Sequence, residues 1–402
     1  MANLTCKDQF NIISENVEEI IPENELIKKI EKSIKNKIPL NVKLGCDPSR
    51  PDLHIGHSVV LNKLKDFQEL GHNVILVIGD FTAMIGDPTG RNKTRPQLDI
   101  LETKKNAKTY INQVSKILNI EKVRIVYNSS WLNKINFSDV VKLCSNFTVS
   151  QFLERDDFNN RYKSGKPISL HEFMYPLAQA YDSVFLRSDI EIGGTDQKFN
   201  LLLARDLQKE HKQSPQATIT MPILEGTDGK AKMSKSYDNF IAFNDKPDDM
   251  YGKILSIQDN LILKYFSLVT NISSKEIKDY EFMLKTGSAN PRDLKRKLAR
   301  EIVSIYYNNK FASLAENNFD KIFIKKTIPE NIPEIIVKEN IKIVNLISNS
   351  KLVNSKSEIR RLIKQGGIKV DDTQVLDIHY EVNPKINKII KIGKRKFIKI
   401  IS

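Results

Sequence analysis

Short apolar runs alternate with longer amphipathic stretches through the first half of the chain. Val42–Cys46 and Val74–Gly79 have the length of buried strands, and the segment between them carries apolar residues at helical spacing. A helical run over Leu101–Leu118 and a further strand at Val123–Tyr127 continue the alternation. Strands separated by helices are typical of a parallel, Rossmann-like α/β sheet, which we expect over residues 41–240. Ligands of such sheets bind at the carboxyl ends of the strands.

The remaining segments are predicted to be mostly helical before the chain ends in a small mixed unit. Residues 1–40 are predicted to form a helical lead-in, and residues from about 130 to 189 a helical insertion in the sheet domain. Residues 241–328 repeat the helical pattern, and the prolines of 329–340 indicate a linker. A capped helix and short strands over 341–402 predict a small α+β domain.

Two histidines, His54 and His57, stand at the opening turn of the helix that follows the first strand. Unpaired backbone N–H groups and the positive end of the helix dipole make such a turn a favourable phosphate site. Gly56 between them would let a base or ribose approach the backbone closely. So short a motif also arises by chance, and a histidine at a helix start is then only a cap.

Two lysines, Lys232 and Lys235, lie in a loop that begins with the turn signals of residues 225–229. A flexible loop that presents ammonium groups suits a polyphosphate that is bound briefly and then released. The alternative interpretation is a solvated basic loop. Because both motifs occur in this order, we interpret them as the two sides of an ATP site.

The positive charge is concentrated at the C-terminal end. The 402 residues carry a formal charge of +14, and residues 341–402 hold 14 Lys and Arg against 5 Asp and Glu, a net of +9. Lys356, Arg360 and Lys364 follow at helical spacing, so their side chains project from one face. Basic charge gathered in one small unit is typical of nucleic-acid binding, and we expect these three residues to contact RNA phosphates.

The composition also bounds the location of the protein. Cys6, Cys46 and Cys144 show no paired spacing, so neither a disulfide framework nor a zinc site is indicated. No apolar run approaches the length of a membrane span, and the acidic first 25 residues contain no arginine, unlike a transit peptide. We therefore expect a cytoplasmic protein without membrane contact.

Further segments extend the two motifs into a family pattern. With the segments 79–81, 85–90, 174–182 and 192–197, the chain resembles the class I aminoacyl-tRNA synthetases, whose HIGH and KMSKS signatures match 54–57 and 232–236. It most resembles the bacterial-type tyrosyl-tRNA synthetases, from about Asn41 to the C-terminus. The resemblance implies a Rossmann-like catalytic domain, a helical anticodon-binding domain and a small C-terminal α+β RNA-binding domain.

The resemblance also implies the reaction and its partners. L-tyrosine would be activated with ATP, and the tyrosyl group would then pass to the 3′ end of tRNA(Tyr). Mg²⁺ is expected to enter with ATP, without a dedicated protein metal site. The helical insertion of the family supplies a dimer contact, so a homodimer is expected.

The family's functional residues carry over to matching positions of this sequence. The residues implied in phosphate chemistry are Ser49, His54, His57, Lys232 and Lys235. Those implied in ATP binding are Gly56, Gly194, Asp196, Arg91, Arg95 and Lys235. Those implied around the substrate tyrosine are Asp87, Tyr175, Gln179, Asp182 and Gln197, with Asp182 accepting the phenol O–H. Taken one at a time, each is equally consistent with an ordinary helix-surface or turn residue.

One position departs from the common family pattern. Many bacterial relatives carry at position 43 a tyrosine that also touches the substrate hydroxyl, whereas this chain has Lys43, as does a subgroup that it resembles. The sequence leaves open whether Lys43 faces the pocket.

Three other functions compete with this interpretation. A small adenylyltransferase also begins a helix with two histidines, but it needs neither the lysine loop nor a basic tail. A non-catalytic RNA-binding protein on the same scaffold predicts damaged signatures. A tryptophanyl enzyme shares the catalytic fold but lacks the C-terminal RNA-binding unit.

Overall fold

The computed structural model describes residues 4–48, 52–87, 100–323, 332–337, 339–350, 352–353, 355–371, 373–383, 388–393 and 396–401. The chain divides into two compact units, residues 1–312 and 313–402, each with its own core.

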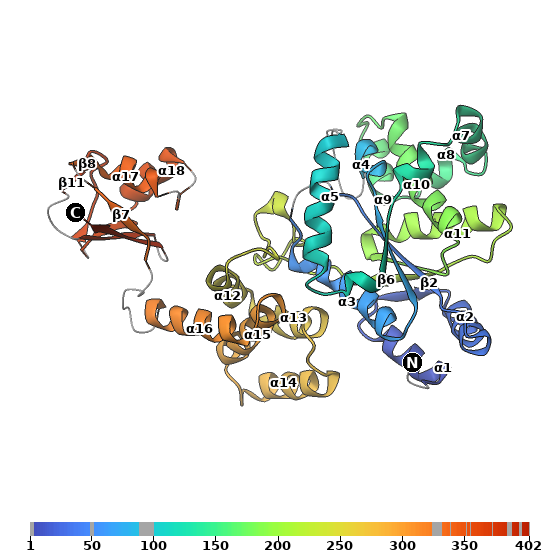
Figure 1. Ribbon diagram of the computed structural model, residues 1–402, viewed down its shortest axis with the longest axis horizontal. Helices are drawn as coiled ribbons and strands as arrows, with labels where there is room; N and C mark the ends of the chain where they lie inside the picture. The colour runs from blue at the N-terminus through green and yellow to red at the C-terminus, as the bar shows by residue number, and fades with distance from the viewer. Residues whose placement is uncertain are drawn as a thin grey trace. The chain divides into compact units, whose positions relative to one another are not determined.

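The first unit is built on a six-stranded sheet with the order β1-β6-β5-β2-β3-β4 (Figure 1). Strands β2 to β6 run parallel. Strand β3, next to the edge strand β4, is buried along Val74–Ile78, and Figure 1 shows helices α5 and α10 on opposite sides of the strands. Burial on both faces explains why the sequence of β3 is continuously apolar rather than alternating. The predicted Rossmann-like sheet is confirmed. The strands are β1 Glu19–Ile21, β2 Asn41–Cys46, β3 Asn73–Ile78, β4 Val123–Tyr127, β5 Ile190–Gly194 and β6 Ala217–Met221.

The strand order creates a switch point between β2 and β5. From β2 the chain adds β3 and β4 on one side, and it later returns to place β5 and β6 on the other side. Loops that leave the carboxyl ends of β2 and β5 therefore diverge and open a crevice, which is where open parallel sheets bind their ligands. The fold alone thus locates a ligand site at the ends of these two strands.

The N-terminal lead-in differs from its purely helical prediction. Besides α1 (Cys6–Ser14) and α2 (Glu23–Asn36), it contains β1, which extends the main sheet antiparallel to β6. This strand has only three residues, too few for a periodic pattern to identify. Helix α2 follows the sequence pattern closely, since Leu26 and Ile30 are fully buried.

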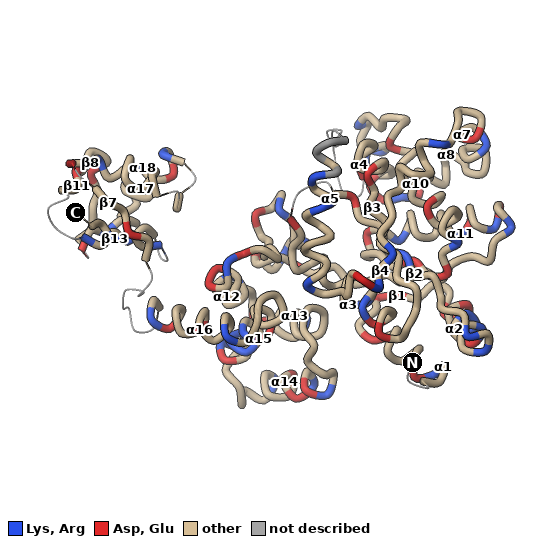
Figure 2. The backbone as a smooth tube through the Cα atoms, viewed as in Figure 1, with Lys and Arg blue, Asp and Glu red and all other residues tan. Residues whose placement is uncertain are grey.

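Helices form the other parts of the first unit (Figure 1). The helical pattern predicted for residues 241–328 is borne out by α15, where the residues at helical spacing Leu294, Leu298, Ile302 and Tyr306 are all buried. Asn290 caps this helix by accepting a hydrogen bond from the Arg292 N–H at 2.9 Å. Basic residues gather on the same helix (Figure 2).

The helices of the chain before the C-terminal domain have the following bounds, and the division between the two units falls within the last of them, α16. The helices before β5 are α3 Ile55–Glu69, α4 Thr82–Ile85, α5 Ile100–Val114, α6 Ser129–Leu132, α7 Phe137–Cys144, α8 Val149–Leu153, α9 Asp156–Lys163 and α10 Leu170–Leu186. Those after β5 are α11 Lys198–Glu210, α12 Pro247–Leu255, α13 Ile262–Val269, α14 Ser274–Thr286, α15 Pro291–Tyr306 and α16 Asn309–Phe323.

The second unit is a small α+β domain around an isoleucine-rich core. Its main sheet has the order β10-β9-β12-β13-β7, and β8 pairs separately with β11. Two of the predicted short strands form a hairpin after Gly367. From the sequence we expected its strands at Ile368–Val370 and Val375–Leu376, but the second strand is Thr373–Gln374. Strand β7 lies in the predicted linker and pairs in parallel with β13. The elements are β7 Glu334–Ile336, β8 Ile341–Lys342, α17 Ile343–Asn349, α18 Lys356–Lys364, β9 Ile368–Val370, β10 Thr373–Gln374, β11 Glu381–Val382, β12 Lys388–Ile392 and β13 Lys396–Ile401.

Candidate active site

The two histidines of the first motif lie at the start of α3, as the sequence predicts. His54 is the N-cap residue and His57 the third helical residue, and their ring centroids are 3.9 Å apart. The Nδ1 atom of His57 lies 3.1 Å from both the backbone nitrogen and the carbonyl oxygen of His54, so it accepts from the first or donates to the second according to its tautomer. Burial lowers the pKa of His57 to about 4, and burial with nearby positive charges lowers that of His54 as well. Both rings are therefore neutral donors at pH 7.

The lysine loop lies against this helix start. The Ile55 N–H donates to the Ile241 carbonyl at 2.9 Å, and His54 forms a bridge with Ala242. Met233, between the two lysines, is buried, and a Cβ added at Gly56 would lie 3.5 Å from its Cβ. The two motifs, far apart in the sequence, thus meet at one place in the fold.

The two lysines of the loop are paired with carboxylates on opposite sides of the helix start. Lys232 Nζ lies 2.9 Å from Asp196 Oδ2, and Lys235 Nζ lies 3.4 Å from Asp52 Oδ2. Asp196 follows β5 and Asp52 follows β2, so the lysines span the switch point of the sheet. Asp196 also lies close to Gly194, where an added Cβ would be 2.7 Å from its Oδ1. The structure therefore brings the predicted ATP residues Gly56, Gly194, Asp196 and Lys235 to one edge of the sheet.

A cavity of about 240 Å³ opens at the ends of β2 and β5. It is lined by backbone and side chains from β2, β3, β5, α4, α5, α10 and α11, and also by His57. All five residues predicted around the substrate tyrosine line it: Asp87, Tyr175, Gln179, Asp182 and Gln197. Three of them lie on α10 at positions i, i+4 and i+7, the spacing of one helix face.

Asp182 is the buried acceptor of this cavity. Its side chain accepts hydrogen bonds from Trp131 Nε1 at 2.8 Å and from Asn128 Nδ2 at 3.2 Å. Burial raises the pKa of Asp182 to about 7, against the opposing effects of Lys43, Trp131 and Asn128. Such a carboxyl group is poised between its ionised and protonated forms at neutral pH.

The other polar groups of the cavity form a connected network. Tyr175 donates to Asp47 at 3.0 Å, and Gln197 donates to Asp87 at 3.1 Å. Asn200 donates to the side-chain oxygens of both Gln179, at 2.9 Å, and Gln197, at 3.1 Å. The network holds several side-chain oxygen atoms at the cavity, which suits recognition of a cationic group by several acceptors.

The carboxyl end of β3, at the same edge of the sheet, requires a glycine. A Cβ at Gly79, directly after β3, would collide with the carboxylate of Asp47 and the hydroxyl of Thr82. Thr82 donates to Asp47 at 2.7 Å, so the close approach of these groups orients the Asp47 side chain toward Tyr175.

Comparison with known proteins agrees with this geometry. Residues 35–324 match the family of class I tRNA synthetases (W and Y), and residues 341–385 match the S4 domain. The tyrosine–tRNA ligase of Thermotoga maritima is 50% identical over 99% of this chain and 98% of its own length. That of Carboxydothermus hydrogenoformans is 51% identical over 98% of each chain. The chain belongs to the class I tyrosyl-tRNA synthetases.

Solved structures share the fold of the catalytic part. The tyrosyl-tRNA synthetase of Archaeoglobus fulgidus, solved with L-tyrosine, superposes with a TM-score of 0.64 at 23% identity, covering 77% of this synthetase and 99% of that chain. The enzyme from Aeropyrum pernix gives a TM-score of 0.63 at 22% identity, covering 79% and 97%.

Several residues of this synthetase site were missed in the sequence. Asp47 and Asp52 stand in the loop beside the first motif, where their position after a strand was a usable signal. Asn128 directly follows the predicted strand Val123–Tyr127 and carried the same signal. Trp131 and Asn200 carry no such signal, since they bind Asp182 and Gln179 only through tertiary packing. Ser49, Arg91 and Arg95 lie outside the described residues.

The position of Lys43 is resolved by the structure. Its side chain is only 1% exposed and is not among the residues that line the cavity. Its ammonium group instead contacts Gln179 and Ser183 of α10 and pairs with Glu191, which does line the cavity. It therefore does not face the substrate space of the synthetase.

The S4-type unit of the synthetase presents the predicted RNA residues. Lys356, Arg360 and Lys364 are exposed on α18, and Ile359 and Ile363 on the same helix are fully buried. Lys356 donates to Asn345 at 3.0 Å.

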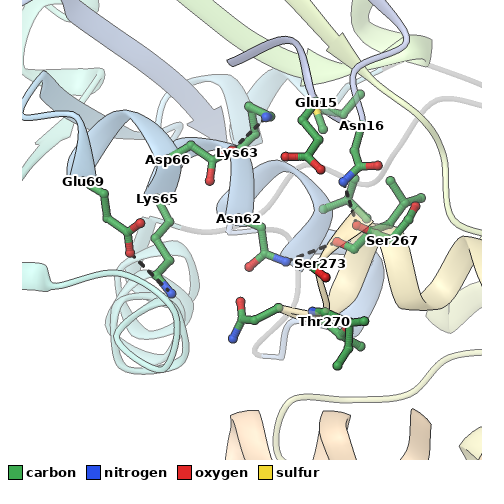
Figure 3. A pocket seen from close by; sticks show the side chains of 15 residues that line it. Glu15, Asn16, Asn62, Lys63, Lys65, Asp66, Glu69, Ser267, Thr270 and Ser273 are labelled. Atoms are coloured by element: carbon green, nitrogen blue, oxygen red, sulfur yellow. Dashed lines mark hydrogen bonds and ion pairs between the residues drawn. The ribbon is translucent and has the colours of Figure 1, made fainter. Parts of the chain in front are cut away.

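A second cavity, of about 280 Å³, lies between α3 and α13 (Figure 3). Its polar groups mainly pair with one another: Asn62 donates to the Leu268 carbonyl at 3.2 Å, and Lys63 lies 2.7 Å from Asp66. None of the predicted site residues lines it. We interpret it as a polar seam that joins α3 to α13.

The described residues hold no group of three or more His, Cys, Asp or Glu side chains arranged for a metal ion. Within the same ranges, no helix is long and apolar enough to cross a membrane.

The hydrogen bond between Trp131 and Asp182 gives a spectroscopic prediction. Trp131 is the only tryptophan of the chain, so its emission should change with pH in a single step with a midpoint near 7, as Asp182 ionises. Asp182→Asn should abolish the step. Because histidines commonly titrate in this range and His211 lines a neighbouring cavity with Trp131, His211→Gln is the control and should leave the step in place. A step that survives in Asp182→Asn would contradict this assignment.

Proposed function

We propose that the chain is a tyrosine–tRNA ligase, which activates L-tyrosine with ATP to tyrosyl-adenylate and pyrophosphate and then transfers tyrosine to the 3′ end of tRNA(Tyr). The observation that carries this proposal is the single cavity in which the buried Asp182 and the signature residue His57 both take part, beside the lysine loop. The name of the relatives that match along the whole chain supports the same activity.

In the first step, a carboxylate oxygen of tyrosine attacks the α-phosphorus of ATP, and the bond to pyrophosphate breaks. No protein nucleophile is needed, because such transfers depend on alignment and on stabilisation of charge. We assign the phosphate contacts to the neutral donors His54 and His57, together with Ser49. In the second step, a hydroxyl of the terminal adenosine attacks the tyrosyl carbonyl carbon, and AMP leaves.

The two lysines would stabilise the leaving pyrophosphate. In the present state Lys232 and Lys235 pair with Asp196 and Asp52, so negative charge already attracts them across the switch point. A triphosphate bound there would compete for both ammonium groups, which frees Asp196 to accept ribose hydroxyls. Gly56 and Gly194 would give the adenosine room to approach the backbone, and Arg91 and Arg95 would serve the pyrophosphate or the tRNA end.

We propose that Mg²⁺ enters the site bound to the phosphate oxygens of ATP. Mg²⁺ usually keeps several waters and binds through substrate phosphate oxygens, so it would neutralise the charge of the triphosphate.

Asp182 is proposed to select tyrosine. Its buried carboxylate would accept the phenol O–H, and the acceptors around Asp87, Tyr175, Gln179 and Gln197 would bind the α-ammonium group. A site that bonds a substrate hydroxyl rejects an analogue without it, a rule for which tyrosyl-tRNA synthetases are themselves the standard example. Within a family that serves both tryptophan and tyrosine, this buried acceptor favours tyrosine.

A homodimer and a cytoplasmic location complete the proposal. Phe137, Val149 and Leu170 of the helical insertion expose 82%, 63% and 81% of their surface. Large apolar side chains gathered on one segment are typical of a protein interface, and we propose that a second copy covers them. The three cysteines are unpaired thiols, which suits the reducing cytoplasm.

The most direct test is amino-acid-dependent exchange of pyrophosphate into ATP, measured with each of the twenty amino acids. Only tyrosine should support exchange. Asp182→Ala should reduce the preference for tyrosine over phenylalanine by about 30- to 100-fold, the value of one hydrogen bond to a charged group. Exchange that depends on another amino acid would overturn the proposed substrate.

Lys235→Ala should slow tyrosyl-adenylate formation by a factor of roughly 100 to 1,000, because a positioned cation at the leaving group stabilises the transition state. Tyrosine binding, measured by equilibrium dialysis, should persist. Lys230→Ala removes an exposed lysine of the same loop and is the matched control. Equal single-turnover rates in the two variants would remove Lys235 from the site.

The RNA contacts of α18 can be tested in the full chain. The triple variant Lys356→Ala, Arg360→Ala, Lys364→Ala should raise the KM for tRNA by roughly tenfold or more and reduce its salt dependence, because three phosphate contacts are lost. Tyrosine-dependent exchange should be unchanged. Lys28, Lys32 and Lys35, also exposed on one helix, provide a control triple variant of equal charge. If both triple variants weakened charging equally, the effect would be one of overall charge.

A further inference from the structure

A buried ion pair lies directly beneath the amino-acid cavity. Lys43, on the central strand β2, is 1% exposed, and Glu191, on the neighbouring strand β5, is fully buried. The Lys43 Nζ lies 2.9 Å from Glu191 Oε1. Lys43 is among the largest fully buried side chains of the described chain, so it does not reach solvent along its stem.

Lys43 also binds one turn of α10. Its ammonium group donates to the Ser183 hydroxyl at 2.5 Å and to the Gln179 carbonyl at 3.2 Å. With Glu191 these contacts occupy all three donors of an ammonium group. Lys43 therefore has no donor left for a substrate, and any role in the reaction must act through its neighbours.

These neighbours belong to the turn of α10 that also contains Asp182, and Gln179 and Asp182 are two of the residues assigned to tyrosine binding. Gln179 and Ser183 flank Asp182 on α10, and the Gln179 side chain also donates to Glu191, at 3.2 Å. Glu191 accepts further hydrogen bonds from Ser183 at 2.8 Å and from Gln216 at 2.5 Å. Lys43 and Glu191 thus hold one turn of α10 against strands β2 and β5. This turn carries Gln179 and Asp182, which line the cavity.

Stability alone is a weak reason for such a pair. Removing two charges from water is costly, and packed apolar residues of similar volume often stabilise a core at least as well. The location offers a better reason, because Asp182 and Glu191 are both buried carboxyl groups that line the same cavity. The buried cation paired with Glu191 offsets part of the negative charge that the two carboxylates would otherwise concentrate there.

On the basis of the proposed function, we propose that Lys43 is a positioning residue for tyrosine recognition, which fixes the turn of α10 that carries Asp182 and places a buried positive charge against it. Of the groups that oppose the effect of burial on the pKa of Asp182, Lys43 acts most strongly, and it outweighs the opposite effect of Glu191. Its charge and its contacts therefore act in the same direction.

The other titratable groups around the cavity leave this effect visible. Cys46, Asp47, His57, Asp87, Tyr110, Tyr175 and Glu191 line the same space as Asp182. The pKa of His57 is lowered to about 4, so this ring stays neutral near pH 7. Glu191 loses its ion-pair partner in Lys43→Met, so a variant that also replaces Glu191 is needed to separate the two effects. The other groups keep their identity in all the variants.

The test measures the ionisation of Asp182 in the full chain through Trp131 emission, without any need for activity. Lys43→Met should move the midpoint of the pH step upward from its value near 7 by about one unit, whereas Lys43→Arg should retain the original midpoint because it keeps the charge. Lys63→Met is the control, since Lys63 is also a buried lysine in an ion pair, with the partly exposed Asp66, but lies at the other cavity (Figure 3). Its midpoint should not move.

Pyrophosphate exchange supplies the second readout. In Lys43→Met, kcat/KM for tyrosine near pH 7 should fall roughly fivefold and recover as the pH rises above the shifted midpoint, since a one-unit shift from pH 7 lowers the ionised fraction of Asp182 from about one half to about one tenth. The loss should appear in KM for tyrosine more than in kcat. A merely structural role would lower activity evenly across the pH range.

A third variant keeps the test open if Lys43→Met does not fold. Lys43→Met with Glu191→Leu removes both charges and leaves neither unpaired, and its midpoint should lie above that of the unsubstituted chain but below that of Lys43→Met. Unchanged midpoints in a folded Lys43→Met or in the double variant would overturn the role of Lys43. Failure of the unsubstituted chain to exchange with tyrosine would instead overturn the proposed function.

Discussion

Backbone pairing between residues 53–55 and 241–243 is the constraint on which the site depends. Ile55 donates to the Ile241 carbonyl, and Phe243 donates to the Leu53 carbonyl at 3.0 Å. These bonds join the start of α3 to the segment that follows the lysine loop, so two motifs separated by most of the catalytic domain share one edge of the sheet. Without this pairing, the histidines would remain only a helix start and the lysines only a basic loop.

The same edge concentrates charges that the fold would not bury for stability. Asp182, Lys43 and Glu191 are almost fully enclosed, and each has hydrogen-bond partners that offset part of the cost of leaving water. Burial strengthens every electrostatic interaction of such groups, which is useful where a single hydroxyl distinguishes one amino acid from another. Local rules of stability are broken here because recognition requires it.

The helical and C-terminal parts follow simpler rules. On α15 and α18 the apolar stripe is buried, whereas the exposed residues are frequently basic, as helical periodicity predicts. Both helices begin at a side-chain cap, Asn290 and Ser355. The bounds and buried faces of these helices could therefore largely be predicted from the sequence, since helix formation and capping depend on residues within one or two turns.

The sequence by itself determined the alternation of β2, α3, β3, α5 and β4, the two signatures and the basic character of the end of the chain, because each rests on local spacing or composition. It did not reveal β1 or β7, which are three residues long and exist only by pairing with distant strands. Nor did it reveal that Trp131 and Asn128 bind Asp182, or that Lys43 turns away from the cavity to Glu191. Those arrangements depend on contacts between residues far apart in the chain, and only the packed tertiary structure decides which of the possible partners meet.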